Sequence, residues 1–245
     1  MKIKVYAQLS IDEKQIRRYL RKAIVCGPIK RGDIYNDINH RFNSIAIIDG
    51  RFDQTLAVSP SEIQDGIRSG LRIYGSSSMG ALRAAELNSF GMIGVGKIFD
   101  YIKNSLLFRD DFVGQVFSEN NKYLKSYSYI DFFFSAKKLV KEKKIDSESA
   151  RLLCRIYSNL YYTERNRLGL LQKIQTYKDC TKLTKSAEIV FKCNYSQKKT
   201  DALELLKKIQ KDCIEIKNVN NLILKNKLES KDPNSFYPRE LFKNF

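Results

Sequence analysis

The sequence of 245 residues contains no apolar run long enough to cross a bilayer, and its opening MKIKVYAQLS lacks the apolar stretch of a secretory signal peptide. The five cysteines are scattered and none stands in a CxxC pair, so neither a disulfide framework nor a zinc site is predicted. The single histidine, His40, lies in a polar, loop-like stretch. We therefore expect a reduced, cytoplasmic location, with no membrane contact and no bound metal.

Positive charge is what the chain has in excess. It contains 44 Lys and Arg against 27 Asp and Glu, a formal net charge of +17, while 43% hydrophobic residues provide for a packed core. Such a charge attracts polyanions: nucleic acid, an anionic membrane surface or an acidic protein partner. The alternative is a composition bias with many solvated lysines, because the lysines are spread along the chain rather than gathered in one arm.

The first 98 residues alternate short apolar runs with helical stretches. KIKVYA, SIAIIDG and LRIYG are typical of strands. Helices are expected from a cap at Ser10, within SPSEIQDGIRSG, and from Met79 onward. Strand–helix alternation with short joints predicts an α/β fold, in which a small parallel sheet with flanking helices forms a core over residues 1–98.

Residues 99–245 have a different character, because glycine and proline become rare and apolar residues recur at helical spacing. We expect a mainly helical region packed on the α/β core. The aromatic cluster in YSYIDFFF is expected to pack in a core rather than to stack on bases. The polar tail ESKDPNSFYPRELFKNF is expected to dock loosely.

The segment GSSSMG, residues 75–80, directly follows one predicted strand and opens a helix. Ligands of open α/β sheets bind at the carboxyl ends of the strands. In the frame of a nucleophile elbow Ser78 takes the nucleophile position and Gly80 the trailing glycine, while Ser76 replaces the leading glycine. Backbone amides at the start of the helix, around Met79, would face a developing negative charge. Two alternatives are that Ser77 or Ser78 caps the helix, or that the segment holds a phosphate without a Walker lysine.

A catalytic serine needs a base, and His40 is a weak candidate for one. Lys30, in CGPIKRGDIY, is the better candidate, because Ser–Lys pairs are a variant of the triad and desolvation turns a lysine into a base. The proline and glycines around it predict an irregular loop. The alternative is that Lys30 and Arg31 are solvated loop charges. Cys26 could be a nucleophile, but nothing around it indicates thiolate stabilisation.

Two further patterns have simpler interpretations. Gly91, Gly94 and Gly96 follow a helix rather than a strand, so they predict tight turns and not a dinucleotide fingerprint. Asp110 and Asp111 form a single acidic pair, which is more typical of a helix cap or a surface turn than of a metal site.

The segments KRGDIY, AIIDGRFDQTLAVSPSEIQDGIRSGLRIYGSSSMGALRAAELNSFGMIGVGKIFDYI and RDDFVGQVF together resemble the TfuA-like proteins. Residues 75–96 are the most specific part, although Ser76 stands where the usual motif has alanine. The resemblance covers roughly residues 1–120, and a weaker similarity is found at YYTERN. TfuA-like proteins accompany YcaO enzymes, which use ATP to activate peptide backbone amides and install thioamides.

The resemblance implies an accessory protein of ribosomal peptide modification that hydrolyses a thiocarboxylated, ThiS-like sulfur carrier and helps YcaO engage the precursor peptide. It implies a hydrolase-like Ser–Lys pair, which falls on Ser78, with Ser77 second, and on Lys30. The remaining expected site residues would bind the substrate: Arg31, Arg83, Asp49, Met79 and Gly80. Of these, Arg31 or Arg83 would hold the anionic thiocarboxylate. No cofactor of its own is expected, since ATP belongs to the YcaO partner.

Two other classes of function stay open. The chain could be a non-catalytic adaptor that docks YcaO and peptide. It could also bind nucleic acid through its charge, but no helix-turn-helix, zinc or RNA-recognition signature supports that reading.

Overall fold

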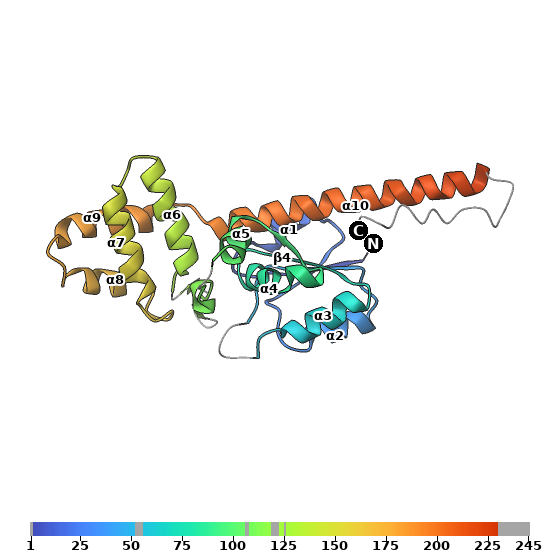
Figure 1. The fold of residues 1–245 in the computed structure, drawn as a ribbon, viewed down its shortest axis with the longest axis horizontal. Coiled ribbons are helices and arrows are strands. Elements are labelled where there is room, and N and C mark those ends of the chain that lie inside the picture. Colours follow the sequence, from blue (N-terminus) through green and yellow to red (C-terminus); the bar gives the residue numbers. More distant parts are fainter. Residues whose placement is uncertain (1, 52–55, 106–107, 119–122, 125, 230–245) are drawn as a thin grey trace. The chain divides into compact units, whose positions relative to one another are not determined.

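The computed structural model describes residues 2–51, 56–105, 108–118, 123–124 and 126–229 (Figure 1). Contacts divide the chain into two units, Met1–Leu206 and Lys207–Phe245. The predicted tail lies almost wholly outside the described residues. None of the helices in the described part is long and apolar enough to span a membrane.

The first unit is built on a sheet of five parallel strands in the order β2–β1–β3–β4–β5. This is the order of flavodoxin-like doubly wound folds, whose ligands bind at the carboxyl edge of the sheet. The strands are β1 Ile3–Tyr6, β2 Ile24–Cys26, β3 Ser44–Ile47, β4 Arg72–Ser76 and β5 Ile93–Val95. Helices α1 Glu13–Tyr19, α2 Asp33–Asn39, α3 Pro60–Arg68 and α4 Met79–Leu87 connect them, and α5 Lys97–Lys103 follows β5.

The predicted α/β class is confirmed, and so are the central elements. All four residues of β3 are buried, as a strand covered on both faces requires. Ser59 begins α3 with a capping box to Glu62 and Pro60 in the first turn. Figure 1 shows α2 and α3 together on one face of the sheet, with α1 on the other.

Several local predictions were wrong or incomplete. Asp12, not Ser10, caps α1: its carboxylate accepts from the Gln15 amide, while the Ser10 hydroxyl donates to Asp49 at 2.5 Å. The stretch around His40, expected to be a loop, contains α2, and two short strands, β2 and β5, were not foreseen. Both strands have only three residues, too few for a clear apolar pattern.

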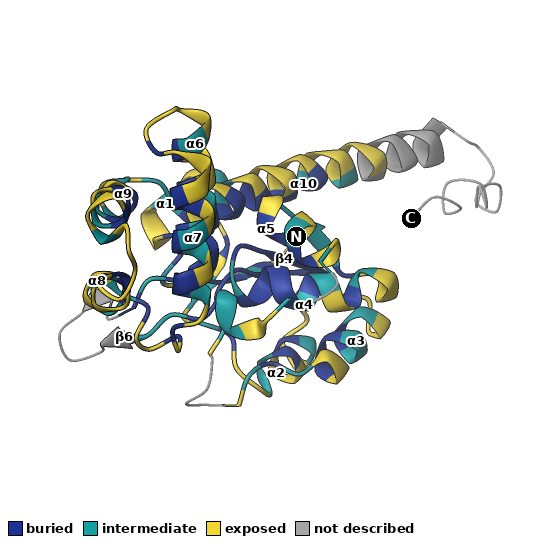
Figure 2. Cartoon of the chain, turned by 60° about the vertical axis from the view of Figure 1, so that its left-hand side comes forward, coloured by how far each residue is buried: buried dark blue, intermediate teal, exposed yellow. Residues whose placement is uncertain are grey.

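The helical part of the first unit has a core of its own. It contains α6 Tyr129–Lys141, α7 Ser147–Ser158, α8 Arg167–Ile174 and α9 Cys180–Lys192, with a short hairpin before them, β6 Phe117–Ser118 and β7 Tyr123–Leu124. The aromatic cluster packs in this core as predicted, with the rings of Phe132 and Tyr157 stacked 4.2 Å apart. Figure 2 shows the buried faces of these helices and the mostly buried α4. A last helix, α10 Gln197–Glu229, begins in the first unit and continues into the second.

Candidate functional site

The link between β4 and α4, residues 76–78, is here called the serine turn. The amide of Ser78 donates to the carbonyl of Ser76 at 2.9 Å, and Ser77 between them has a φ of 70°. A three-residue turn with positive φ at its centre is a rare and strained γ-turn for a residue with a side chain. In a nucleophile elbow the strained residue is the nucleophile, and by that criterion alone the frame would begin at Gly75 and centre on Ser77, with Met79 in place of the trailing glycine.

Neither of the last two serines caps the helix. Ser78 is the N-cap residue of α4 but makes no capping bond; its hydroxyl donates instead to the carbonyl of Val113 at 3.3 Å. The hydroxyl of Ser77 is fully buried and has no hydrogen-bond partner among the described residues. The capping alternative is therefore wrong for both. A strained backbone and an unused hydroxyl in one turn are typical of a functional site.

Two glycines bring the serine turn close to the ends of β3 and β4. A Cβ atom on Gly80 would lie 1.8 Å from the carbonyl oxygen of Ile47, and one on Gly75 would lie 2.1 Å from the carbonyl oxygen of Gly80. No larger residue fits at either position without moving backbone. The first turn of α4 therefore sits directly on the carboxyl edge of the sheet, as the sequence pattern predicted.

Two amides at the start of α4 already have an acceptor. Ser78 and Gly80 both donate to the carbonyl of Ile48 at 3.3 Å, a distance beyond the usual range for N–H···O bonds. A substrate oxygen at this position would compete with Ile48 for these amides.

Lys30 lies at the same edge of the sheet, in the loop after β2, and β1 and β3 stand between β2 and β4. Its neighbour Ile29 forms a β-bridge with Gly50, and an added Cβ on Gly50 would meet the side chain of Met79 at 2.5 Å. Lys30 itself is exposed and lines an open hollow of about 720 Å³ together with Arg51. No hydrogen bond joins Lys30 to either serine, so their pairing stays a prediction.

The expected substrate-binding side chains are largely engaged within the protein. The buried carboxylate of Asp49 accepts from three amides and the hydroxyl of the segment that follows β1, so it anchors that loop. Arg83 donates to the Val58 carbonyl at 2.9 Å and forms an ion pair with Glu86. Met79 is buried, whereas Arg31 is exposed at the loop of Lys30.

The weaker candidates have ordinary structural roles. His40 is exposed and ends α2. Burial raises the pKa of the Cys26 thiol, which disfavours a reactive thiolate. Gly91 and Gly96 have φ values of 101° and 103°, as tight turns require, whereas Gly94 lies within β5 against Phe99. No cluster of three or more metal-binding side chains occurs in the part of the chain that the structure describes.

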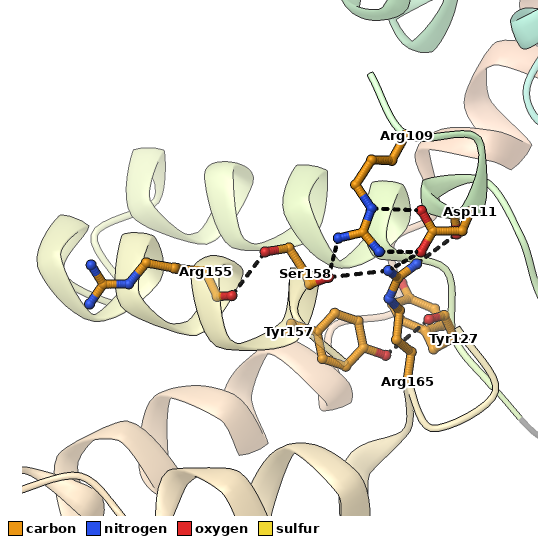
Figure 3. A network of polar contacts seen from close by, with 7 residues as sticks. All are labelled: Arg109, Asp111, Tyr127, Arg155, Tyr157, Ser158 and Arg165. Atoms are coloured by element: carbon orange, nitrogen blue, oxygen red, sulfur yellow. Dashed lines mark hydrogen bonds and ion pairs between the residues drawn. The ribbon is translucent and has the colours of Figure 1, made fainter. Parts of the chain in front are cut away.

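Asp111 belongs to a buried ion-pair network rather than to a metal site (Figure 3). Arg165 is fully buried, and its guanidinium donates to the Asp111 carboxylate at 2.6 Å and to the Asp111 carbonyl at 2.6 Å. Both Arg165 and the exposed Arg109 also donate to the carbonyl of Ser158 at the end of α7. The network holds the segment that carries Val113, two residues further on, against the helical part.

Part of the chain matches a known family. Residues 49–166 match the family model described as TfuA-like protein. The chain is a TfuA-like protein. No curated protein matches the sequence. The matched region contains the serine turn, Val113 and the Arg165 network, and the family is associated with YcaO enzymes, so this TfuA-like protein has an accessory role linked to YcaO.

One polar residue close to the serine turn was missed by sequence reasoning. Lys198, near the start of α10, is 2% exposed, and its Nζ donates to the same Val113 carbonyl at 2.6 Å and to Gln115 Oε1 at 2.9 Å. In the sequence it is the first of two adjacent lysines, and nothing distinguishes it from the exposed Lys199. Only its burial in the fold of this TfuA-like protein identifies it.

Proposed function

We propose that this TfuA-like protein hydrolyses the C-terminal thiocarboxylate of a ThiS-like sulfur carrier, delivers the sulfide to a YcaO partner, and helps that partner engage a ribosomal precursor peptide for thioamidation. The serine turn is the observation that carries the proposal. Its hydroxyls lie at the carboxyl end of β4, its central residue has positive φ, and neither Ser77 nor Ser78 caps the helix that follows. A turn with a purely structural role would be expected to use these hydroxyls as caps and to leave none, such as that of Ser77, without a partner among the described residues.

In the proposed reaction the Ser78 oxygen attacks the carbonyl carbon of the thiocarboxylate while a lysine amine takes its proton. The carbon–sulfur bond breaks, and the sulfur leaves as hydrosulfide after that proton is passed to it. Water then hydrolyses the serine ester, which restores the hydroxyl and releases the carrier. The overall reaction converts thiocarboxylate and water into carboxylate, hydrosulfide and one proton. Hydrosulfide leaves far more readily than an amine, so few catalytic groups are needed.

Ser78 is preferred over Ser77 as the nucleophile because its hydroxyl is only partly buried and its present acceptor is a single long bond of 3.3 Å. Ser77 is the second candidate on the strength of its φ of 70°. Lys30 is the base that the sequence predicts. Its exposed ammonium on the hollow also suits the anionic end of the carrier.

The experiment measures sulfide release from a C-terminally thiocarboxylated ThiS-like carrier by the wild type, Ser78→Ala and Ser77→Ala, with the surface variant Ser61→Ala as control. Loss of the nucleophile lowers the rate by at least about 100-fold, whereas Ser61→Ala retains it. YcaO binding, measured in parallel, stays unchanged. Activity that persists in Ser78→Ala but disappears in Ser77→Ala assigns the nucleophile to Ser77.

A non-catalytic adaptor is the second candidate, favoured by the engagement of two helix-start amides with Ile48. Undiminished sulfide release in both serine variants, or none in the wild type, refutes hydrolysis by the turn and leaves the adaptor. Binding to an acidic carrier should also weaken as salt is raised. Salt-dependent binding to random oligonucleotides instead would favour the nucleic-acid alternative.

A further inference from the structure

Lys198 is a lysine in an unusual environment. It is 2% exposed at the start of α10, within the first unit, whereas the adjacent Lys199 is exposed. Moving an ammonium group out of water is costly, so a buried lysine needs close partners and usually has a task that requires it there.

The partners of Lys198 place it beside the serine turn. Its Nζ and the hydroxyl of Ser78 both donate to one oxygen, the carbonyl of Val113, at 2.6 and 3.3 Å. Sharing one acceptor places both groups around the same carbonyl oxygen. The Lys198 amine is therefore the basic group that shares a hydrogen-bond acceptor with Ser78. It is available to take the serine proton once the Ser78 hydroxyl releases its long hydrogen bond to Val113.

The structure gives Lys198 Nζ two hydrogen-bond acceptors, the Val113 carbonyl and Gln115 Oε1. A neutral amine has two N–H groups and one lone pair, so these two acceptors would satisfy its donors and leave the lone pair for a proton. An ammonium group would have a third donor to satisfy.

The charges around Lys198 act in opposite directions. Burial lowers the pKa of Lys198, while Asp131 on α6 and Asp49 after β3 raise it to a smaller extent. Burial also raises the pKa of Asp131, whose carboxylate accepts from the Lys198 backbone amide at 3.0 Å and from the Ser196 hydroxyl at 3.1 Å. A lysine whose pKa lies below its usual range is better suited to accept and return a proton.

We infer that Lys198, rather than Lys30, is the lysine that takes the proton of Ser78, an inference that rests on the proposed function. The Ser78 proton passes to the Lys198 amine as the serine oxygen bonds to the thiocarboxylate carbon. The resulting ammonium gives that proton to the departing sulfur, which leaves as hydrosulfide. When water then hydrolyses the serine ester, Lys198 takes a proton from that water and returns it to the Ser78 oxygen. Lys30, exposed on the hollow, serves substrate binding instead.

Three lysine variants test the inference: Lys198→Met, the adjacent control Lys199→Met, and Lys30→Met. For hydrolysis of the thiocarboxylated carrier, Lys198→Met should lower kcat by about 100-fold or more, as expected for loss of a general base. Lys199→Met should stay within about twofold of wild type, and Lys30→Met should raise KM at nearly constant kcat. A 100-fold loss of kcat in Lys30→Met with wild-type kcat in Lys198→Met overturns the inference.

Because Lys198 is buried, Lys198→Met could fail to fold, so a second variant keeps the amine. Gln115→Glu places a carboxylate against the Lys198 Nζ and raises its pKa. The rising limb of the pH profile of kcat/KM should then move to higher pH by about one unit, a shift that a structural lysine would not produce. An unchanged profile in an active Gln115→Glu protein overturns the inference.

Labelling by a serine-directed fluorophosphonate separates this inference from the proposed function. Absence of sulfide release by the wild type refutes the proposed function, but Ser78 activated by Lys198 would still be labelled, and more slowly in Lys198→Met than in Lys199→Met. Equal labelling rates in these two variants, or no Ser78-dependent labelling of the wild type, refute the role of Lys198.

Discussion

The α/β part and the helical part of the first unit are each stabilised by a different kind of internal contact. In the α/β part, backbone approaches backbone, and glycines permit contacts that no side chain would allow: a Cβ on Gly80 would overlap the carbonyl of Ile47. In the helical part, long side chains fill the space, and a buried Arg165 satisfies the carbonyls and the carboxylate around it. Close backbone packing positions the serine turn, and side-chain networks position the segment that covers it.

Gly80→Ala tests the backbone contact and should have the largest effect. The added methyl group cannot avoid the Ile47 carbonyl, so α4 must move off the edge of the sheet, at a cost of about 4 kcal/mol or more in the free energy of unfolding. Urea-induced unfolding measures this loss of free energy of unfolding. Gly27→Ala is the matched control, because its Cβ would meet only the Gln8 side chain at 3.9 Å. Equal stability of the two variants would contradict the close packing.

Arg165→Met tests the side-chain network and should cost about 3 kcal/mol, because it leaves the Asp111 carboxylate and two carbonyls without their buried donor. Arg109→Met removes an exposed guanidinium from the same Asp111 carboxylate and Ser158 carbonyl, so it should cost under about 1 kcal/mol. Thermal unfolding of both variants measures the difference. Equal losses would mean that burial does not set the strength of the network.

Asp201, on α10, shows both kinds of contact at one place. Its side chain lies against the backbone of Gly96, where a Cβ would not fit, and it accepts a hydrogen bond from the Ile98 amide at 2.7 Å. Burial raises the pKa of its carboxyl to about 6. The folded state therefore favours the protonated form, whose stabilising effect is complete below about pH 4 and lost as pH rises through about 6.

Asp201→Asn should remove this titration. Relative to wild type, its free energy of unfolding should rise by about 2 kcal/mol between pH 4 and pH 7. Urea unfolding at several pH values measures the change, and an unchanged difference between the two proteins across this range would contradict the raised pKa.

The same contrast explains which features could be predicted. The buried β3 was recognised from a continuous apolar run, and the start of α3 from Ser59 and Pro60, because these signals are local. The strands β2 and β5 were missed, since three residues carry no periodicity and neighbouring strands supply their pairing. Ser10 was expected to cap α1, but its hydroxyl bonds Asp49, which lies 39 residues away in the chain.

Apolar runs, caps and glycine spacing act over a few residues, so the amino-acid order alone is enough to establish the α/β class, the position of the serine segment after a strand, and the family resemblance. Three features depend on the folded molecule: Ser77 has positive φ, the Ser78 hydroxyl bonds Val113, and Lys198 is buried while Lys199 is exposed. They depend on it because they arise from contacts between residues that are far apart in the chain. Lys198 meets the Val113 carbonyl across 85 residues, and adjacent lysines differ only through what the fold packs around them.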